Sequence, residues 1–299
     1  MNKSYELRYD PIKRDYLYLH RTTSTTLGSF YHQHEAYELI LFLRGHVNLY
    51  IENSCYHLQP GDIVVIHPDE MHRAVTLDDT EYERITINLQ RSYLERLSTT
   101  TTQLFECFDS RTKGTGNIAH LNELQLTQFL RLAGELENVL DSDEYGSDIL
   151  ANSYLAQLLV FTNIVFQQAN GTPANIMPPL VRHTMEYIDK HLTQEISLDR
   201  LAAAFHMNGT YISRRFKQHT GLTLRSYILG RRIALAKTFL SGGLTVTEAC
   251  YQSGFSDYAN FIRSFTKIVG ISPGKYAKKS HAPVIEDRTI SLRNKVTPS

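Results

Sequence analysis

Residues 250–277 read CYQSGFSDYANFIRSFTKIVGISPGKYA, and a related stretch, FHMNGTYISRRFKQHTGLTLRSYI, occupies residues 205–228. When the chain is slid along itself by 49 residues, Arg214 falls on Arg263 and Phe216 falls on Phe265. Each copy has the pattern of a short helix, a tight turn and a second helix. The repeat therefore predicts an all-α segment, residues 180–280, that contains two helix-turn-helix units.

Capping residues mark where these helices begin. Ser197 and Asn208 are expected to cap the helices 198–205 and 209–219, because their side-chain oxygens can accept from free backbone N–H groups. In the second copy, residues 245–248 (TVTE) form a capping-box pattern, and Ser256 is the expected cap of the helix 257–267. A long helix over residues 224–240, about 25 Å at ~1.5 Å per residue, would hold the two copies apart.

The second helix of each copy is amphipathic, with aromatic and aliphatic residues four apart on one face. On the opposite faces, Arg214 and Arg263 are expected to fork onto guanine, and Ala259 and Ile262 to contact thymine methyl groups. Lys217, Lys267 and the arginine pair 231–232 are expected to neutralise phosphates. The full predicted DNA-contacting set is Thr210, Tyr211, Ser213, Arg214, Lys217, Arg231, Arg232, Tyr258, Ala259, Ile262, Arg263 and Lys267.

The formal net charge of zero conceals two halves of opposite sign. Residues 1–177 hold 13 Lys and Arg against 23 Asp and Glu, whereas residues 178–280 hold 15 against 6. A basic block of this kind is typical of a module that binds a polyanion. The alternative is a helical bundle whose basic residues are merely solvated, and the second helix-turn-helix copy favours DNA binding over it.

These residues also carry a resemblance. The two stretches quoted above are similar to the paired helix-turn-helix domain of the AraC/XylS family, over residues 180–279, and the pattern around Gly254, Phe265 and the segment GISPGKY is specific to it. The resemblance implies double-stranded DNA bound at asymmetric sites, with the recognition helices in successive major grooves. It also implies a small-molecule effector, RNA polymerase as a partner and a homodimer. Because Trp and Gln are missing from the outward positions, the resemblance does not supply the target sequence.

The first part of the chain has a different pattern. From residue 5 to about residue 87, short runs rich in Tyr, Ile, Val and Leu alternate with turn residues, as in a small β-barrel or sandwich. The chain as a whole is therefore predicted to be α+β, with an N-terminal barrel and a C-terminal helical domain.

A group of metal-binding residue types lies within this barrel pattern. His32, His34 and Glu38 are evenly spaced, so on one strand they would share a face, and His72 follows Gly61 by eleven residues. Three imidazoles and one carboxylate could hold a divalent metal. The spacing resembles the two cupin motifs, although Asp69 stands where that pattern usually has a glycine.

The resemblance to effector-responsive regulators makes the barrel the sensing domain, and three interpretations of its interior remain open. The histidines could line the pocket of an organic effector, such as a sugar or sugar derivative, they could bind metal, or they could be a remnant framework. Arg44, Tyr50 and His67, on neighbouring strands, are further candidates for the pocket wall.

Between the barrel and the basic block the sequence predicts two helices, residues 122–140 and 149–169, that either cap the barrel or form a dimer surface. The predicted boundaries are a sensing domain over 1–120, a helical layer over 121–170, a linker over 171–179, the DNA-binding domain over 180–280 and a polar tail over 281–299. The linker is expected because residues 169–179 are rich in Gly and Pro and lack periodicity.

Composition limits the function classes. The hydrophobic content of 42% and charged content of 21% are those of a globular protein, and no long apolar segment stands out, so no membrane contact and a cytosolic location are expected. Three widely spaced cysteines predict free thiols. The leading hypothesis is an effector-controlled, non-enzymatic regulator. Its rivals are a cupin metalloenzyme with a DNA-binding appendage and an architectural DNA binder without a sensor.

Overall fold

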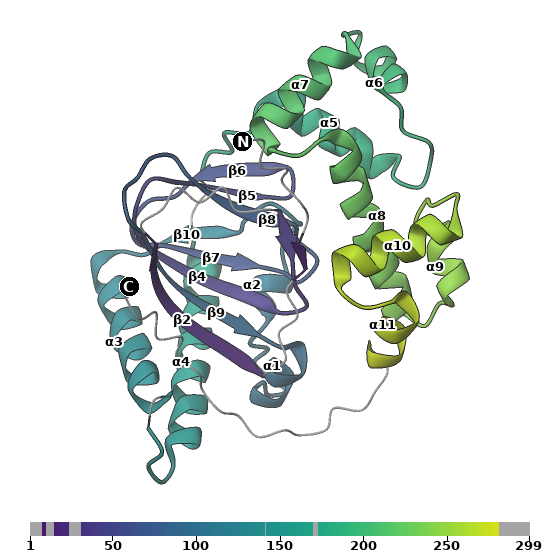
Figure 1. Ribbon diagram of the computed structural model, residues 1–299. Helices are drawn as coiled ribbons and strands as arrows, with labels where there is room; N and C mark the ends of the chain where they lie inside the picture. The colour runs from purple at the N-terminus through teal and green to yellow at the C-terminus, as the bar shows by residue number, and fades with distance from the viewer. Residues whose placement is uncertain (1–7, 10–14, 24–30, 141, 170–172, 281–299) are drawn as a thin grey trace, which may run out of the picture.

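The computed structural model describes residues 8–9, 15–23, 31–140, 142–169 and 173–280, and it is α+β (Figure 1). Strands and two long helices form the N-terminal half, and shorter helices arranged along one long helix form the C-terminal half. The predicted fold class is thus confirmed. The predicted tail, residues 281–299, lies outside the described residues.

Within the described residues, two five-stranded sheets build the N-terminal half, in the orders β1-β3-β8-β5-β6 and β10-β7-β4-β9-β2. The strands are β1 (Arg8–Tyr9), β2 (Tyr16–Thr23), β3 (His32–Gln33), β4 (Tyr37–Arg44), β5 (Val47–Ile51), β6 (Ser54–His57), β7 (Asp62–Ile66), β8 (His72–Thr76), β9 (Tyr82–Leu89) and β10 (Ile118–His120). Except for the parallel β1–β3 pair, the pairings are antiparallel.

Strand β4 shows why the second sheet is central. Its run of apolar residues does not alternate with polar ones, because both of its faces are buried. Leu39 and Leu41 belong to the core between this sheet and the helices, whereas Ile40 and Phe42 belong to the core between the two sheets. Glu38, on the same inner face as Ile40, is therefore carried into the interior.

The outer face of this sheet is covered by α3 (Glu123–Leu140) and α4 (Ser147–Gln168), with the short helices α1 (Arg91–Leu97) and α2 (Glu106–Asp109) beside them. Helix α4 is long and apolar enough to cross a membrane by length and composition. It packs Leu155, Leu158 and Leu159 into the protein core, which is the ordinary reason for such a helix in a globular domain.

The C-terminal half consists of α5 (Pro179–Lys190), α6 (Leu198–Phe205), α7 (Gly209–Thr220), α8 (Leu224–Ser241), α9 (Val246–Gln252), α10 (Tyr258–Val269) and α11 (Pro273–Ser280). Helices α6–α7 and α9–α10 are the two helix-turn-helix units. Ser197 and Asn208 cap their helices as predicted, and Thr245 with Glu248 forms the capping box. The cap of α10 is Asp257, whose carboxylate accepts from the Asn260 N–H, so the prediction of Ser256 was wrong by one residue.

Helix α8 joins two separate cores. Leu224 and Tyr227, near its start, pack with α5, α6 and α7, whereas Ile233 and Leu240 pack with α9, α10 and α11. The two units are therefore attached to opposite ends of one helix of about 27 Å, at ~1.5 Å per residue.

Gly254 shows why the second turn needs a glycine. Its φ of +89° is strained for any residue with a side chain, and an added Cβ would lie 2.8 Å from both the Leu192 carbonyl oxygen and the Thr193 Cα. The turn of α9–α10 is thereby pressed against the loop that follows α5.

The expected linker contacts the sheet where it is described. Asn175 Oδ1 accepts from the Cys55 backbone N–H at 3.0 Å, and the Ile176 N–H donates to the Cys55 carbonyl at 2.8 Å. Residues 175 and 176 are thus hydrogen-bonded to Cys55 of β6. The three cysteines are buried free thiols, as predicted.

We expect Phe129→Ala to lower the free energy of unfolding by about 3–5 kcal/mol, because Phe129 on α3 is fully buried against Phe161 and its removal leaves a cavity. Urea unfolding followed by circular dichroism measures this loss. Leu124→Ala on the same helix is the control, since Leu124 is 79% exposed, and it should change the value by no more than about 0.5 kcal/mol. Equal losses for the two variants would contradict the assignment of α3 to the core.

Candidate functional site

A cavity of about 320 Å³ lies between the two sheets. Its wall is formed by inward residues of β2, β4, β5, β8 and β9, together with the β3 region. The lining residues are Leu17, Leu19, Arg21, His32, His34, Glu38, Ile40, Leu49, His72, Ala74, Thr76, Tyr82, Arg84, Thr86 and Asn88. This volume, at the small end of ligand pockets, suits a metabolite.

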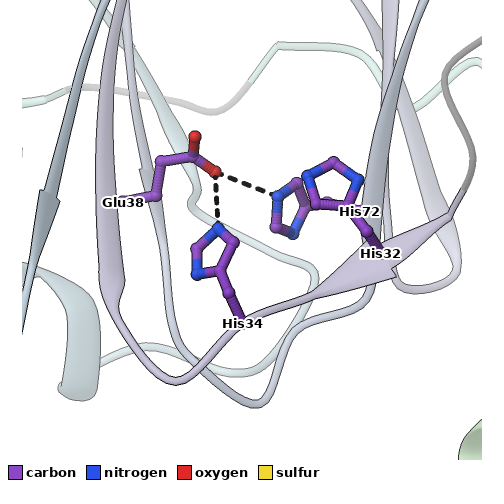
Figure 2. Close-up of side chains that lie close together, drawn as sticks. All are labelled: His32, His34, Glu38 and His72. Atoms are coloured by element: carbon purple, nitrogen blue, oxygen red, sulfur yellow. Dashed lines mark hydrogen bonds and ion pairs between the residues drawn. The ribbon is translucent and has the colours of Figure 1, made fainter. Parts of the chain in front are cut away.

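The predicted histidines and glutamate meet in this cavity (Figure 2). One ligand atom from each of His32, His34, Glu38 and His72 lies within 4.8 Å of the others. They do not share one strand, as the even spacing had suggested, because β3 ends at Gln33 and β4 begins at Tyr37. The chain turns between them, and the pairing of His32 with His72 brings β8 to the same place.

Backbone carbonyls orient two of these imidazoles. His34 Nδ1 is 2.8 Å from the Ala36 carbonyl oxygen and His72 Nδ1 is 3.0 Å from that of Glu70. Each Nδ1–H donates to its carbonyl, which leaves Nε2 directed at the Glu38 carboxylate. The Nε2 to Oε2 distances are 3.2 Å from His34 and 2.9 Å from His72 (Figure 2).

The charges in this cluster stabilise one another. Burial alone would raise the pKa of the Glu38 carboxyl, but the two imidazoles hold that pKa well below its ordinary value. Burial likewise opposes the charged form of His72, and the interaction with Glu38 nevertheless raises the pKa of this imidazole. The cluster is therefore a buried carboxylate held by a hydrogen bond with His34 and an ion pair with His72.

The same atoms fit a divalent metal. A metal-bound histidine commonly donates its second ring nitrogen to a carbonyl, as His34 and His72 do here, and three imidazoles with one carboxylate are a suitable donor set for Zn²⁺ and similar ions. Each of the four residues offers one donor atom: His32, His34, Glu38 and His72. Of these, His72 is only 3% exposed.

Three further residues expected in the pocket wall lie elsewhere. Arg44 is exposed and pairs with Glu81 at 2.5 Å, and Tyr50 lies on the opposite face of β5 from Leu49, against Arg73. His67 packs on Tyr37, outside the cavity. The three residues were predicted to line the pocket because they lie on neighbouring strands. Which face of the sheet each side chain takes depends on strand register, which the sequence does not reveal.

Sequence reasoning also missed the polar wall supplied by β9. Tyr82, Arg84, Thr86 and Asn88 alternate along this strand and face the cavity, with Arg21 beside them on β2. The alternation of polar residues in YERITINL is the signal that could have revealed them, since an inward polar face is unusual in a small barrel.

The two recognition helices present most of the predicted DNA-contacting residues to solvent. On α7, Thr210, Tyr211, Arg214 and Lys217 are exposed and Ser213 is half-buried. On α10 the exposed members are Tyr258, Ala259, Arg263 and Lys267. Ile262 is half-buried and packs against the core of the second unit, so it offers less surface to a thymine methyl than predicted.

The arginine pair expected to contact phosphate is used differently. Arg231 forms ion pairs with Glu52 of the N-terminal half and with Asp189 at 2.8 Å, and its side chain is only 17% exposed. Arg232 donates to the carbonyls of Leu192 and Gln194, at 2.9 and 2.6 Å. Both guanidiniums therefore hold α8 against neighbouring segments of the protein. This corrects the prediction that Arg231 and Arg232 contact phosphate.

Strand β8 contacts both halves of the protein. His72 faces the cavity, whereas the next residue, Arg73, faces the helices: it donates to the His219 carbonyl at 3.1 Å, and its guanidinium lies between the rings of Tyr31 and Tyr50. His219 is in the last turn of α7, where a cation is favoured by the helix dipole. The preceding Met71 N–H donates to Glu52, the partner of Arg231.

Comparison with known proteins gives matches to both halves. Residues 16–159 match the model of an AraC-like ligand binding domain, and residues 201–279 match that of a helix-turn-helix domain. The transcriptional regulator YbfI of Bacillus subtilis is 23% identical over 234 residues, covering 77% of this chain and 80% of YbfI. The transcriptional activator RhaR of Escherichia coli K12 is 20% identical over 246 residues, covering 82% and 86%.

Among solved structures, that of ToxT from Vibrio cholerae with a bound unsaturated fatty acid is 13% identical. The match covers 88% of this chain and 94% of that chain, with a TM-score of 0.36.

We expect Arg231→Met to lower the free energy of unfolding by about 3–5 kcal/mol, because it leaves the carboxylate of Glu52 buried without its partner. Adding Glu52→Gln should recover part of the loss. Arg225→Met, at an exposed position of the same helix, is the control. Unchanged stability together with weaker DNA binding would instead identify Arg231 as a phosphate contact.

Proposed function

This chain belongs to the AraC family of transcription regulators, and from that premise we propose that a small molecule in the barrel cavity controls how the two helix-turn-helix units engage DNA. The observation that carries the proposal is the alternation of strand β8, which places His72 in the cavity and Arg73 on the end of α7. A change in the cavity can thus act on the first helix-turn-helix unit through adjacent residues of one strand.

The rigid attachment of β8 supports this role. Glu70, just before the strand, is fully buried and accepts from Arg111 Nη2 at 2.5 Å and from the Gly114 and His67 N–H groups at 2.7 and 2.8 Å. Coupling between distant sites is carried by hydrogen-bonded and packed elements of this kind. In thermodynamic terms, an occupant that prefers one placement of β8 shifts the population of DNA-binding arrangements.

The polar cavity also distinguishes this function from a purely architectural DNA binder, for which an apolar barrel interior is expected. A buried carboxylate, three imidazoles and two arginines line the wall. Glu38, His34 and His72 are buried, and charged or polar groups are costly to bury, so their retention favours a ligand-binding role. We assign them to holding an effector rather than to turnover of a substrate.

For DNA recognition, we infer that Arg214 and Arg263 read bases while Lys217 and Lys267 neutralise phosphates. Both arginines are exposed on the outward faces of α7 and α10, and Arg214 is held near Tyr211, its guanidinium 5.9 Å from the ring centroid. Helix α8, about 27 Å long at ~1.5 Å per residue, lies between the two recognition helices, and we infer that it sets their separation near one turn of a DNA duplex, ~34 Å.

The remaining partners follow from the same proposal. Val160 and Ile164 are exposed and lie four residues apart on one face of α4, and a second copy of the chain is the partner proposed for this face. RNA polymerase is the partner expected beside a promoter. The reduced cysteines are consistent with a cytoplasmic location.

We expect Arg214→Ala and Arg263→Ala each to relax base preference in one half of the bound site, by about 1–3 kcal/mol of discrimination, because each removes a bidentate donor. Sites selected from a random DNA library with each purified variant measure this. Lys217→Ala is the matched contrast: it should weaken all sequences alike and reduce the dependence of affinity on salt. Uniform weakening by the arginine variants would show that they contact phosphate instead.

We further propose that the His–Glu cluster binds one divalent ion, which would supply a Lewis-acidic centre for an oxygen of the effector. Titration of the chelator-treated protein with Co²⁺, followed by visible absorption, should show saturable binding that His34→Ala and His72→Ala abolish. His67→Ala is the control, because this histidine lies outside the cavity. Uptake that is unaffected by all three substitutions would rule out the cluster as the metal site.

A further inference from the structure

Two arginines lie at the opposite end of the cavity from the His–Glu cluster. Arg21 of β2 and Arg84 of β9 are directly paired across the antiparallel ladder, and both line the cavity. Side chains at directly opposed positions start only about 4.5–5.5 Å apart, so like charges there repel each other. Within the part of the chain that the structure describes, the neighbouring Glu83 pairs with His20 and Arg44, and neither Arg21 nor Arg84 forms an ion pair with a carboxylate.

The Arg84 guanidinium is fixed in place by neutral groups. Its Nη1 donates to Thr23 Oγ1 at 3.0 Å, and its guanidinium carbon lies 4.1 Å from the centroid of the Tyr82 ring. Neither contact neutralises the charge. The cavity therefore holds a positioned positive group beside a second one, which is the arrangement that recognises an anion.

Asn88 lies at the other end of the same face of β9, and its surroundings independently indicate a ligand. Its side chain is buried, at 6% exposure, and lines the cavity next to Glu38, to which it is paired in register. Its Oδ1 has no hydrogen-bond partner among the described residues. A buried acceptor left unpaired costs free energy, and a hydroxyl group of a ligand would satisfy it.

We propose that the cavity binds a small anionic polyol, that is, a hydroxylated carbon chain bearing a carboxylate or phosphate. The anionic group lies against Arg21 and Arg84, and hydroxyl groups reach Thr86 and Asn88. Asn88 lies four residues beyond Arg84 on β9, which is about 13 Å at ~3.3 Å per residue, and the arginine side chains shorten this gap to the length of a five- or six-carbon chain.

This ligand class rests on the proposal that the cavity is the effector site, but it can be tested without DNA. The probes are matched sets that share one skeleton: glucose, glucuronate and glucose 6-phosphate, with the corresponding sets built on galactose and mannose. Isothermal titration is performed on chelator-treated protein, so that any bound metal does not contribute. Sodium acetate at equal ionic strength controls for non-specific salt effects.

At least one anionic member is expected to bind about tenfold or more tightly than its neutral counterpart, since hydrogen bonds to charged groups are the stronger ones. Whether the acid or the phosphate binds distinguishes the two sources of charge. Arg84→Gln and Arg21→Gln should each remove that preference. Arg21 is exposed, so its substitution keeps the fold even if that of Arg84 does not.

Arg44→Gln is the matched control, because Arg44 lies on the neighbouring strand but pairs with Glu81 outside the cavity. Equal or tighter binding of the neutral sugars, or no binding of any anionic member, overturns the proposed ligand class. Anion binding that leaves DNA affinity unchanged supports the ligand class and instead contradicts the proposed regulatory role.

Discussion

The alternation of side chains along strand β8 is the constraint on which the arrangement of this protein depends. Successive side chains of a strand point to opposite faces. When His72 points into the cavity, Arg73 must therefore point away from it, toward α7. Around this pair, Glu38 holds one imidazole inside, and the last turn of α7 accepts the guanidinium outside. The sensing and DNA-binding halves are thus attached to one stretch of backbone.

The acidic N-terminal half and the basic C-terminal half are joined by an ion pair near this contact. Glu52, from the acidic half, and Arg231, from the basic half, form a buried ion pair beside the apolar contacts of Tyr31 and Met71. Burial raises the pKa of the Glu52 carboxyl although Arg231 acts against it, whereas Glu52 and Asp189 raise the pKa of the Arg231 guanidinium. Removing both charges from water costs free energy that their attraction offsets. Such a contact is suited to specifying one relative placement of the halves more than to adding stability.

Much of the helical half could be predicted from the sequence, because its determinants are local. Caps such as Ser197 and Thr245 act within three residues, and the repeat reveals its own periodicity. The error at Asp257 arose where Ser256 and Asp257 offer the same chemistry at adjacent positions. Arg231 was misassigned for a different reason: its partner Glu52 is 179 residues away, and no local pattern indicates that pair.

The cavity was predicted only in part, for the same reason. The spacing of His34 and Glu38 belongs to a recognisable motif, but the face taken by Arg44, Tyr50 and Arg84 depends on strand register. A shift of one residue in register moves a side chain to the other face of a sheet, and sequence alone does not fix it.

The central claim is that cavity occupancy and DNA binding are linked through β8. The most direct measurement is the affinity of the cavity for an occupant, titrated in the absence and in the presence of saturating operator DNA. Linkage requires the coupling to be reciprocal, so the account predicts that DNA changes this affinity by about 5- to 150-fold, and that Arg73→Gln removes the change. Equal affinity with and without DNA would contradict the account.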